Sequence, residues 1–267
     1  MAEDYDAYRR DLWRDKADAY RRSFADLCAH PVGDLLDAVR ASSGTSILDV
    51  GCGTGSLTEA ASTRKADVTA VDAEPSMVAA TAARVSSARI SVAALPRLPF
   101  EAGTFDGVAA NFVINHVARP AVAVTELARV TRPSGRVGVT VWPQPAPPLQ
   151  QLWDDVVEAA GVIRPPTPGV AADFPRTADG LRGLLEQSGL DEVEVRTVRW
   201  EHRVDPERWW AGAADGLAGI GYVISRQDAA TVQRMRDCYD ELVRMHLDRD
   251  GLLCLPTVAL LAVGRAR

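Results

Sequence analysis

Residues 47 to 55 read Ile47-Leu48-Asp49-Val50-Gly51-Cys52-Gly53-Thr54-Gly55, and this stretch decides the fold. An apolar strand runs into three alternating glycines, and a helical pattern follows them. Because glycine lacks a Cβ, such a loop can turn tightly and let a ligand approach the backbone closely. In open parallel sheets, ligands bind outside the carboxyl ends of the strands. The stretch therefore predicts a small-molecule site directly after the first strand.

Apolar runs typical of strands alternate with helical patterns beyond this loop. The expected strands are residues 45–50, 66–71, 89–93, 105–110 and 136–142, and the helices between them are residues 57–64, 76–84 and 121–131. Such alternation requires crossover connections and a parallel sheet that is covered on both faces. We therefore expect an α/β fold with a Rossmann-like open sheet that is mostly parallel, has an antiparallel last strand and carries helices on both faces.

The remaining segments are expected to surround this sheet within a single domain, residues 1–267. Apolar spacing in the N-terminal part indicates helices, proline-rich PQPAPP and RPPTPG bound one further helix, and a long helical segment precedes the last apolar run. The expected parts are an N-terminal helical lid (1–44), a cofactor-binding half (45–142), an inserted helix (143–175), the rest of the sheet (176–204 and 252–267) and an inserted helical cap (205–251).

The composition excludes several classes of protein. The chain has 267 residues, 47% of them hydrophobic and 25% charged, and its formal net charge is -6. That balance is typical of a folded domain, and the negative charge disfavours nucleic acid and anionic membranes as partners. The N-terminal sequence is charged and no long apolar stretch is present, so a cytoplasmic location is expected. Four scattered cysteines indicate neither disulfides nor a metal site.

Two carboxylates beside the glycine loop narrow the identity of the ligand. A dinucleotide fingerprint needs a glycine where this chain has Ser56. Asp49 would repel a pyrophosphate but suits an ammonium group. Asp72, at the end of the second strand, can accept hydrogen bonds from both hydroxyls of a ribose. An ammonium group and a ribose together describe S-adenosylmethionine.

Four motifs in order resemble those of the class I S-adenosylmethionine-dependent methyltransferases. They resemble the small-molecule branch known as methyltransferase type 11, or the ubiquinone-biosynthesis-like branch. The motifs are ILDVGCGTG (47–55), VTAVDAEPSMV (68–78), LPFEAGTFDGVAANFVINHV (98–117) and ELARVTRPSGRV (126–137). The resemblance implies S-adenosyl-L-methionine as cofactor and S-adenosyl-L-homocysteine as product.

The resemblance also implies roles for residues of the loop and the second strand. Gly51, Gly53 and Gly55 would line the methionine and ribose portions of the cofactor. Asp49 would lie near its amino group and Asp72 on its ribose.

Other residues would complete the cofactor site. Met77 would pack on the adenine. Many relatives hold the adenine amino group with an aspartate where this chain has Ala94, so backbone groups near Leu95 and packing would replace that contact. Asn111 would face the sulfonium and its methyl group. Tyr20 lies where relatives have a lid that closes over the cofactor.

Methyl transfer from a sulfonium is an in-line displacement, so positioning and exclusion of water can suffice for catalysis. If the acceptor must lose a proton, His116 is the candidate general base, because its place in the motif puts it over the cofactor. A structural hydrogen-bonding role is the alternative for His116, and equally for Asn111 and Asn115. His202 is a weaker candidate that we expect on an exposed strand.

The acceptor is expected to be a small, aromatic or hydrophobic metabolite. The resemblance further implies a role in secondary metabolism. Five of the six tryptophans follow residue 141, which indicates an aromatic pocket or, alternatively, the core of a cap. Residues 111–114 lack the Asn/Asp-Pro-Pro-aromatic motif of nucleic-acid amino methylases. An NAD(P)-dependent oxidoreductase and a non-catalytic S-adenosylmethionine-binding protein are the alternatives. The methylated atom and the oligomeric state stay open.

Overall fold

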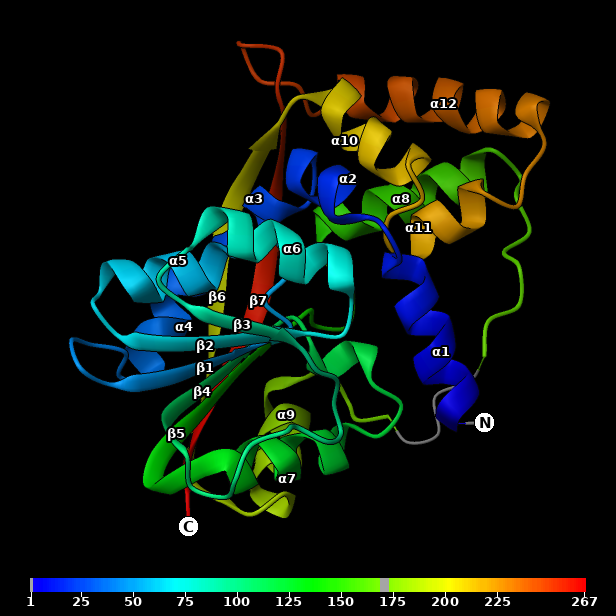
Figure 1. The fold of residues 1–267 in the computed structure, drawn as a ribbon. Helices are drawn as coiled ribbons and strands as arrows, with labels where there is room; N and C mark the ends of the chain where they lie inside the picture. Colours follow the sequence, from blue (N-terminus) through cyan, green and yellow to red (C-terminus); the bar gives the residue numbers. More distant parts are fainter. Residues whose placement is uncertain (1, 169–172) are drawn as a thin grey trace.

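Seven strands form one open sheet in the order β3-β2-β1-β4-β5-β7-β6 in the computed structural model, which describes residues 2–168 and 173–267 (Figure 1). Neighbouring strands from β3 to β5 pair in parallel, whereas β7 runs antiparallel to both β5 and β6. The expected fold class, including the antiparallel last strand, is confirmed. The strands are β1 (Ser46–Val50), β2 (Asp67–Asp72), β3 (Arg89–Val92), β4 (Phe105–Asn111), β5 (Thr131–Val141), β6 (Leu190–Val204) and β7 (Leu253–Ala266).

Helices cover both faces of the sheet, which is why its central strands are almost continuously apolar. One face carries α4 (Val32–Ala38), α5 (Ser56–Thr63) and α6 (Pro75–Arg84), and the other carries α7 (Pro120–Val130) and α9 (Ala178–Gln187) (Figure 1). Each helix buries the apolar positions that recur every three or four residues. The glycine loop begins at the carboxyl end of β1 and leads into α5.

The cap is built on the part of the β6–β7 pair that extends past the other strands (Figure 1). Aromatic side chains form its core: Trp153 stacks on Tyr239 with ring centroids 5.4 Å apart, and it also contacts Trp209 and Trp210. Trp209 is 1% exposed. The cap-core interpretation therefore holds for these three tryptophans. The cap helices are α8 (Pro148–Ala159), α10 (Pro206–Ala214), α11 (Ala218–Ile224) and α12 (Ala229–Arg244).

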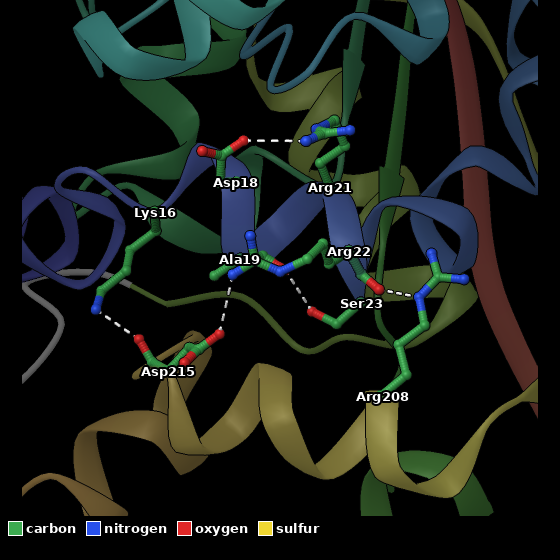
Figure 2. Close-up of polar contacts among 8 residues, drawn as sticks. All are labelled: Lys16, Asp18, Ala19, Arg21, Arg22, Ser23, Arg208 and Asp215. Atoms are coloured by element: carbon green, nitrogen blue, oxygen red, sulfur yellow. Dashed lines mark hydrogen bonds and ion pairs between the residues drawn. The ribbon is translucent and has the colours of Figure 1, made fainter.

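The N-terminal lid contacts the cap directly. It consists of α1 (Ala2–Trp13), α2 (Ala17–Arg22) and α3 (Ala25–Ala29). At the junction, Lys16 Nζ donates to the carbonyl of Asp215 at 2.5 Å, and Arg22 pairs with the Asp215 carboxylate at 3.3 Å (Figure 2). Arg208 of α10 donates to the carbonyl of Arg22 (Figure 2). Phe24 stacks on Trp209 with centroids 4.4 Å apart.

The expectation that His202 lies exposed on a strand is wrong. Its side chain is 6% exposed, and its ring lies 5.6 Å from that of Trp209, centroid to centroid. The cause is non-local, because β6 continues under α10 and the cap covers the face that His202 occupies. Burial lowers the pKa of His202 to about 4, so the ring is neutral at pH 7.

Two further expectations concern membranes and metals. Within residues 2–168 and 173–267, no helix is long and apolar enough to cross a membrane. The same described residues contain no cluster of three His, Cys, Asp or Glu side chains that could hold a metal ion. Cys28, Cys52, Cys238 and Cys254 form no disulfides. The expected division of the chain into lid, cofactor half and cap stays a prediction.

Gly212 lets the lid and the cap pack closely, because a Cβ at this position would lie 2.4 Å from Ser23 Oγ. We predict that Gly212→Val lowers the free energy of unfolding by about 1–3 kcal/mol, as overpacked sites do. Urea unfolding measures this. Gly219→Val is the matched control, since a Cβ there meets no atom within 4 Å, and its effect should stay below about 0.5 kcal/mol. Equal effects of the two substitutions would contradict the close packing.

Candidate functional site

The glycine loop is wedged between two other segments of the site. Gly51 has φ +72°, and a Cβ added there would lie 2.4 Å from Val113 Cγ2, beyond β4. Gly55 has φ +90°, and a Cβ added there would lie 3.2 Å from Thr81 Cγ2 of α6. Side chains at these positions would be strained and would fill the space between the segments. The loop therefore packs closely against Val113 and Thr81 at the carboxyl end of β1, and it needs glycine at both positions.

Asp49 places a buried carboxyl group directly under this loop. It is 1% exposed, and its Oδ2 accepts a hydrogen bond from Thr58 Oγ1, in the first turns of α5, at 2.6 Å. Burial raises the pKa of Asp49 to about 7, although the Thr58 bond acts in the opposite direction. Among the described residues no cation pairs with it. A buried carboxylate without a cationic partner is suited to the ammonium group of a ligand.

Asp72 joins the end of β2 to the glycine loop. Its Oδ2 accepts from the backbone N–H of Gly53 and its Oδ1 from that of Glu74, both at 2.9 Å. Burial raises the pKa of this carboxyl group, and the two backbone hydrogen bonds oppose the shift. Met77 follows in the first turn of α6 and is 4% exposed. An acceptor group for ribose hydroxyls and an apolar side chain thus lie beside the loop.

The segment expected to hold the adenine turns back on itself. Ala94 and Arg97 form an isolated antiparallel bridge, and Leu95 packs on the core cluster below the sheet. Ala94 carries no polar side-chain atom, so recognition of an amino group here falls to the backbone. The roles expected for Ala94 and Leu95 stay predictions.

Tyr20 of the lid covers the glycine loop. Its Cε1 atom lies 3.5 Å from where a Cβ at Gly53 would be. Burial raises the pKa of the Tyr20 phenol, and the neighbouring Cys28, Asp72 and Asp49 raise it further. The phenol is therefore neutral and lies close to both carboxylates of the site.

Trp13 is a lid residue that our sequence reasoning did not assign to the site. Its ring meets Tyr20 edge-on with centroids 5.8 Å apart, and His116 with centroids 5.6 Å apart. One feature of the sequence could have indicated Trp13, because it is the lone tryptophan before residue 142 and lies on an expected lid helix. Trp13 links the lid to the segment that follows β4.

Asn111 lies at the end of β4, and both polar groups of its side-chain amide form hydrogen bonds within the protein. Its Nδ2 donates to the carbonyl of Cys28 at 2.8 Å, and its Oδ1 accepts from Thr140 Oγ1 at 2.6 Å. The side chain therefore ties the lid to β4 and β5. The sequence carried no signal for these partners, which lie 83 and 29 residues away. The catalytic role expected for Asn111, next to the sulfonium, stays a prediction.

His116 ends the short 3-10 helix Ile114–His116, which follows β4. Its Nδ1 is buried and has no hydrogen-bond partner, and the same holds for Oδ1 of Asn115. A buried polar atom without a partner is unusual and is consistent with a site for a bound molecule. The role of His116 as a general base stays a prediction.

Most of the expected cofactor residues come together at the carboxyl ends of the central strands. S-adenosylmethionine needs three features that are present here. They are a buried carboxyl group without a cation among the described residues, a second carboxylate at the end of β2, and a tight loop in which side chains would not fit. Thr54 Oγ1, within the same loop, is a further buried atom without a partner. The residues present therefore fit this cofactor.

Comparisons with known proteins match the part of the chain that contains the glycine loop. The family profile described as "Methyltransferase domain" matches residues 48–139. The chain is 32% identical over 166 residues to a ubiquinone biosynthesis O-methyltransferase of Xylella fastidiosa, covering 60% of this chain and 66% of that protein. It is 32% identical over 168 residues to a demethylmenaquinone methyltransferase of Renibacterium salmoninarum, covering 62% and 70%.

Solved structures share the fold at low sequence identity. A putative methyltransferase from an antibiotic biosynthesis pathway of Anabaena variabilis has a TM-score of 0.62 and 16% identity, covering 86% of this chain and 95% of that one. Phosphoethanolamine N-methyltransferase 2 of Haemonchus contortus, in complex with S-adenosyl-L-methionine, has a TM-score of 0.54 and 15% identity, covering 88% and 52%.

The raised pKa of Asp49 makes a prediction about stability. An acid whose pKa rises on folding stabilises the fold below its ordinary pKa of 3.8, and this contribution is lost as the pH rises toward 7. Asp49→Asn should therefore be more stable than the wild type at pH 8, by about 2–4 kcal/mol. The difference should shrink as the pH falls from about 7 to about 4. Urea unfolding across this range measures it.

Asp106→Asn is the matched control, because a hydrogen bond from the Ser46 N–H and the guanidinium of Arg132 lower the pKa of Asp106. That substitution should reduce stability at pH 8. An Asp49→Asn variant that is less stable than the wild type at pH 8 would contradict the assignment.

Proposed function

This chain belongs to the class I S-adenosylmethionine-dependent methyltransferases, and we propose that it methylates a small, aromatic or hydrophobic metabolite and releases S-adenosylhomocysteine. The buried, cation-free carboxyl group of Asp49 under the glycine loop is the observation that carries this proposal. Relatives named for ubiquinone and menaquinone synthesis support a ring-containing acceptor. The chain spans 66% of the length of the Xylella relative, so the exact acceptor of that protein is not carried over to this chain.

The residues around the loop would hold the cofactor as follows. Asp49 binds the amino group, and Asp72 accepts hydrogen bonds from the ribose hydroxyls. Gly51, Gly53 and Gly55 provide a backbone surface for the methionine and ribose portions. The adenine packs on Met77 and meets the backbone near Ala94 and Leu95. The bound cofactor supplies a methyl group on a positively charged sulfur.

The lid and the segment after β4 would organise the acceptor. Tyr20 and Trp13 exclude water from the cofactor, which raises the strength of the electrostatic contacts inside. Asn111 positions the lid through Cys28. His116 accepts the proton of the acceptor at its buried nitrogen, if the acceptor must lose one. The family assignment decides against the NAD(P)-dependent oxidoreductase.

The activity is tested by measuring S-adenosylhomocysteine formed with a panel of phenols, catechols and quinols, with and without acidic substituents. We expect at least one acceptor to raise the rate above the acceptor-free background. Binding of S-adenosylhomocysteine without turnover of any acceptor would instead identify a non-catalytic binding protein. No binding of the cofactor or its product would overturn the whole proposal.

Cofactor binding should depend on pH through Asp49. Because the ligand's ammonium group favours the ionised carboxylate, binding at pH 6 should release about one proton. The dissociation constant of S-adenosylhomocysteine should rise about tenfold per pH unit below 7. Calorimetry in two buffers with different ionisation enthalpies measures both quantities.

Asp49→Asn should abolish this proton release and weaken binding at pH 8 by at least about tenfold. Asp67→Asn is the control, since Asp67 lies at the opposite end of β2 and pairs with Arg89. Binding that releases no proton in the wild type would refute the role of Asp49.

The proposed role of His116 is tested by His116→Gln with the acceptor found in the panel. Loss of a general base should lower kcat about 10²–10⁴-fold and leave the affinity for S-adenosylhomocysteine within threefold of the wild type. The pH–rate profile should also lose its acidic limb. His246→Gln, at an exposed position, is the control. An unchanged kcat, or a loss confined to affinity and stability, would leave His116 a structural group.

A further inference from the structure

The inner face of α1 carries Tyr5, Arg9 and Trp13 at intervals of four residues, so these side chains lie in one row. Trp13 contacts His116, as described above. Asp6 Oδ1, one turn before Arg9, accepts from the backbone N–H of Ala118 at 2.8 Å. Because contacts on both sides of Arg9 reach residues 116–118, Arg9 lies beside the segment that carries His116.

A second arginine reaches the same place from the other side. The carbonyl of Arg176 accepts from the backbone N–H of Gln144 at 3.0 Å, which fixes Arg176 near the end of β5. Its side chain is 22% exposed. Burial lowers the pKa of Arg9, and the positive charge of Arg176 lowers it further. The backbone contacts of Gln144 and Ala118 therefore bring Arg176 and Arg9 to the segments that follow β5 and β4, on the two sides of His116.

Four polar atoms in this region are buried and have no hydrogen-bond partner among the side chains of residues 5–168 and 173–267. They are Nε of Arg9, Nε of Arg176, Nδ1 of His116 and Oδ1 of Asn115. Buried unpaired groups cost free energy, so such a concentration calls for a bound partner. Three of the four are nitrogen atoms, and both arginine atoms are obligate donors.

Two neighbouring carboxylates balance part of this charge, but neither accepts a hydrogen bond from the Nε–H groups of Arg9 and Arg176. Asp6 is engaged with the backbone of Ala118, and Asp173 lies 3.6 Å from Arg176 with a side chain that is 47% exposed. Among residues 5–168 and 173–267, whose side chains the structure describes, no carboxylate lies within ion-pair distance of Arg9. Arg176 is thus paired with Asp173, while the Nε–H groups of Arg9 and Arg176 have no acceptor among the described residues.

We propose that Arg9 and Arg176 bind an anionic oxygen group of the methyl acceptor, a carboxylate or a phosphate, beside His116. The planar guanidinium fork matches both groups with paired hydrogen bonds. Tyr5 and Trp13 flank Arg9 and provide aromatic surface for a ring that carries the anion. This inference rests on the proposed function and names its acceptor as an aromatic anion.

The experiment compares benzoate, phenyl phosphate and benzamide as probes of the full-length protein saturated with S-adenosylhomocysteine. Benzamide has the shape of benzoate without its charge. Calorimetry or ligand-observed NMR gives each dissociation constant at pH 7.5 and low salt. The variants are Arg9→Gln, Arg176→Gln and the double substitution. Arg10→Gln, at the next and solvent-exposed position of α1, is the control.

We expect one of the two anions to bind the wild type at least tenfold more tightly than benzamide, and the tighter one identifies carboxylate or phosphate. The preference should fall below twofold in the double variant and persist in Arg10→Gln. Equal binding of all three probes by the wild type overturns the inference, as does a preference that survives in the double variant.

Binding of S-adenosylhomocysteine is measured first in every variant and separates the two levels of the account. If it binds normally and no anion preference exists, the inference about Arg9 and Arg176 fails alone. If it does not bind the wild type, the proposed function fails. Should the double variant fail to fold, the probe comparison on the wild type and on each single variant still decides.

Discussion

The site depends on a carboxyl group, that of Asp49, held inside the protein without a cation. Asp49 lies near the end of β1, directly before the glycine loop. Thr58 of α5 fixes the orientation of its carboxyl group through a 2.6 Å hydrogen bond. Burial disfavours the ionised form of this carboxyl group and raises its pKa to about 7. In the proposed complex, the ammonium group of the cofactor would offset this cost, so the unfavourable burial of Asp49 would become affinity for the ligand.

The N-terminal lid helices and the cap are connected to each other. Asn111 holds the lid at Cys28, while Lys16 and Arg22 join it to Asp215 next to α10. Exposed ion pairs contribute little free energy, so the close packing at Gly212 and the stacking of Phe24 on Trp209 carry more of this connection. Movement of the lid away from the cofactor would therefore disturb the cap as well.

The fold and the cofactor half could be predicted from the sequence because their signals are local. Strand and helix periods, the three glycines of the loop and the acidic residue at the end of β2 all lie in short stretches of sequence. The partners of Asn111, the burial of His202 under α10 and the approach of Arg176 to Arg9 depend on segments far apart in the chain, and no local pattern indicates them. The tryptophan distribution left pocket and core equally open, and packing within the cap decided for the core at Trp153, Trp209 and Trp210.

A crystal structure of the protein with S-adenosylhomocysteine tests the central claim most directly. The amino group of the ligand should lie within hydrogen-bond distance of the Asp49 carboxylate or of a water molecule bound to it. Both ribose hydroxyls should face Asp72, and the Tyr20 ring should cover the ligand. A ligand bound elsewhere, or bound at the loop with its amino group turned away from Asp49, would contradict the account.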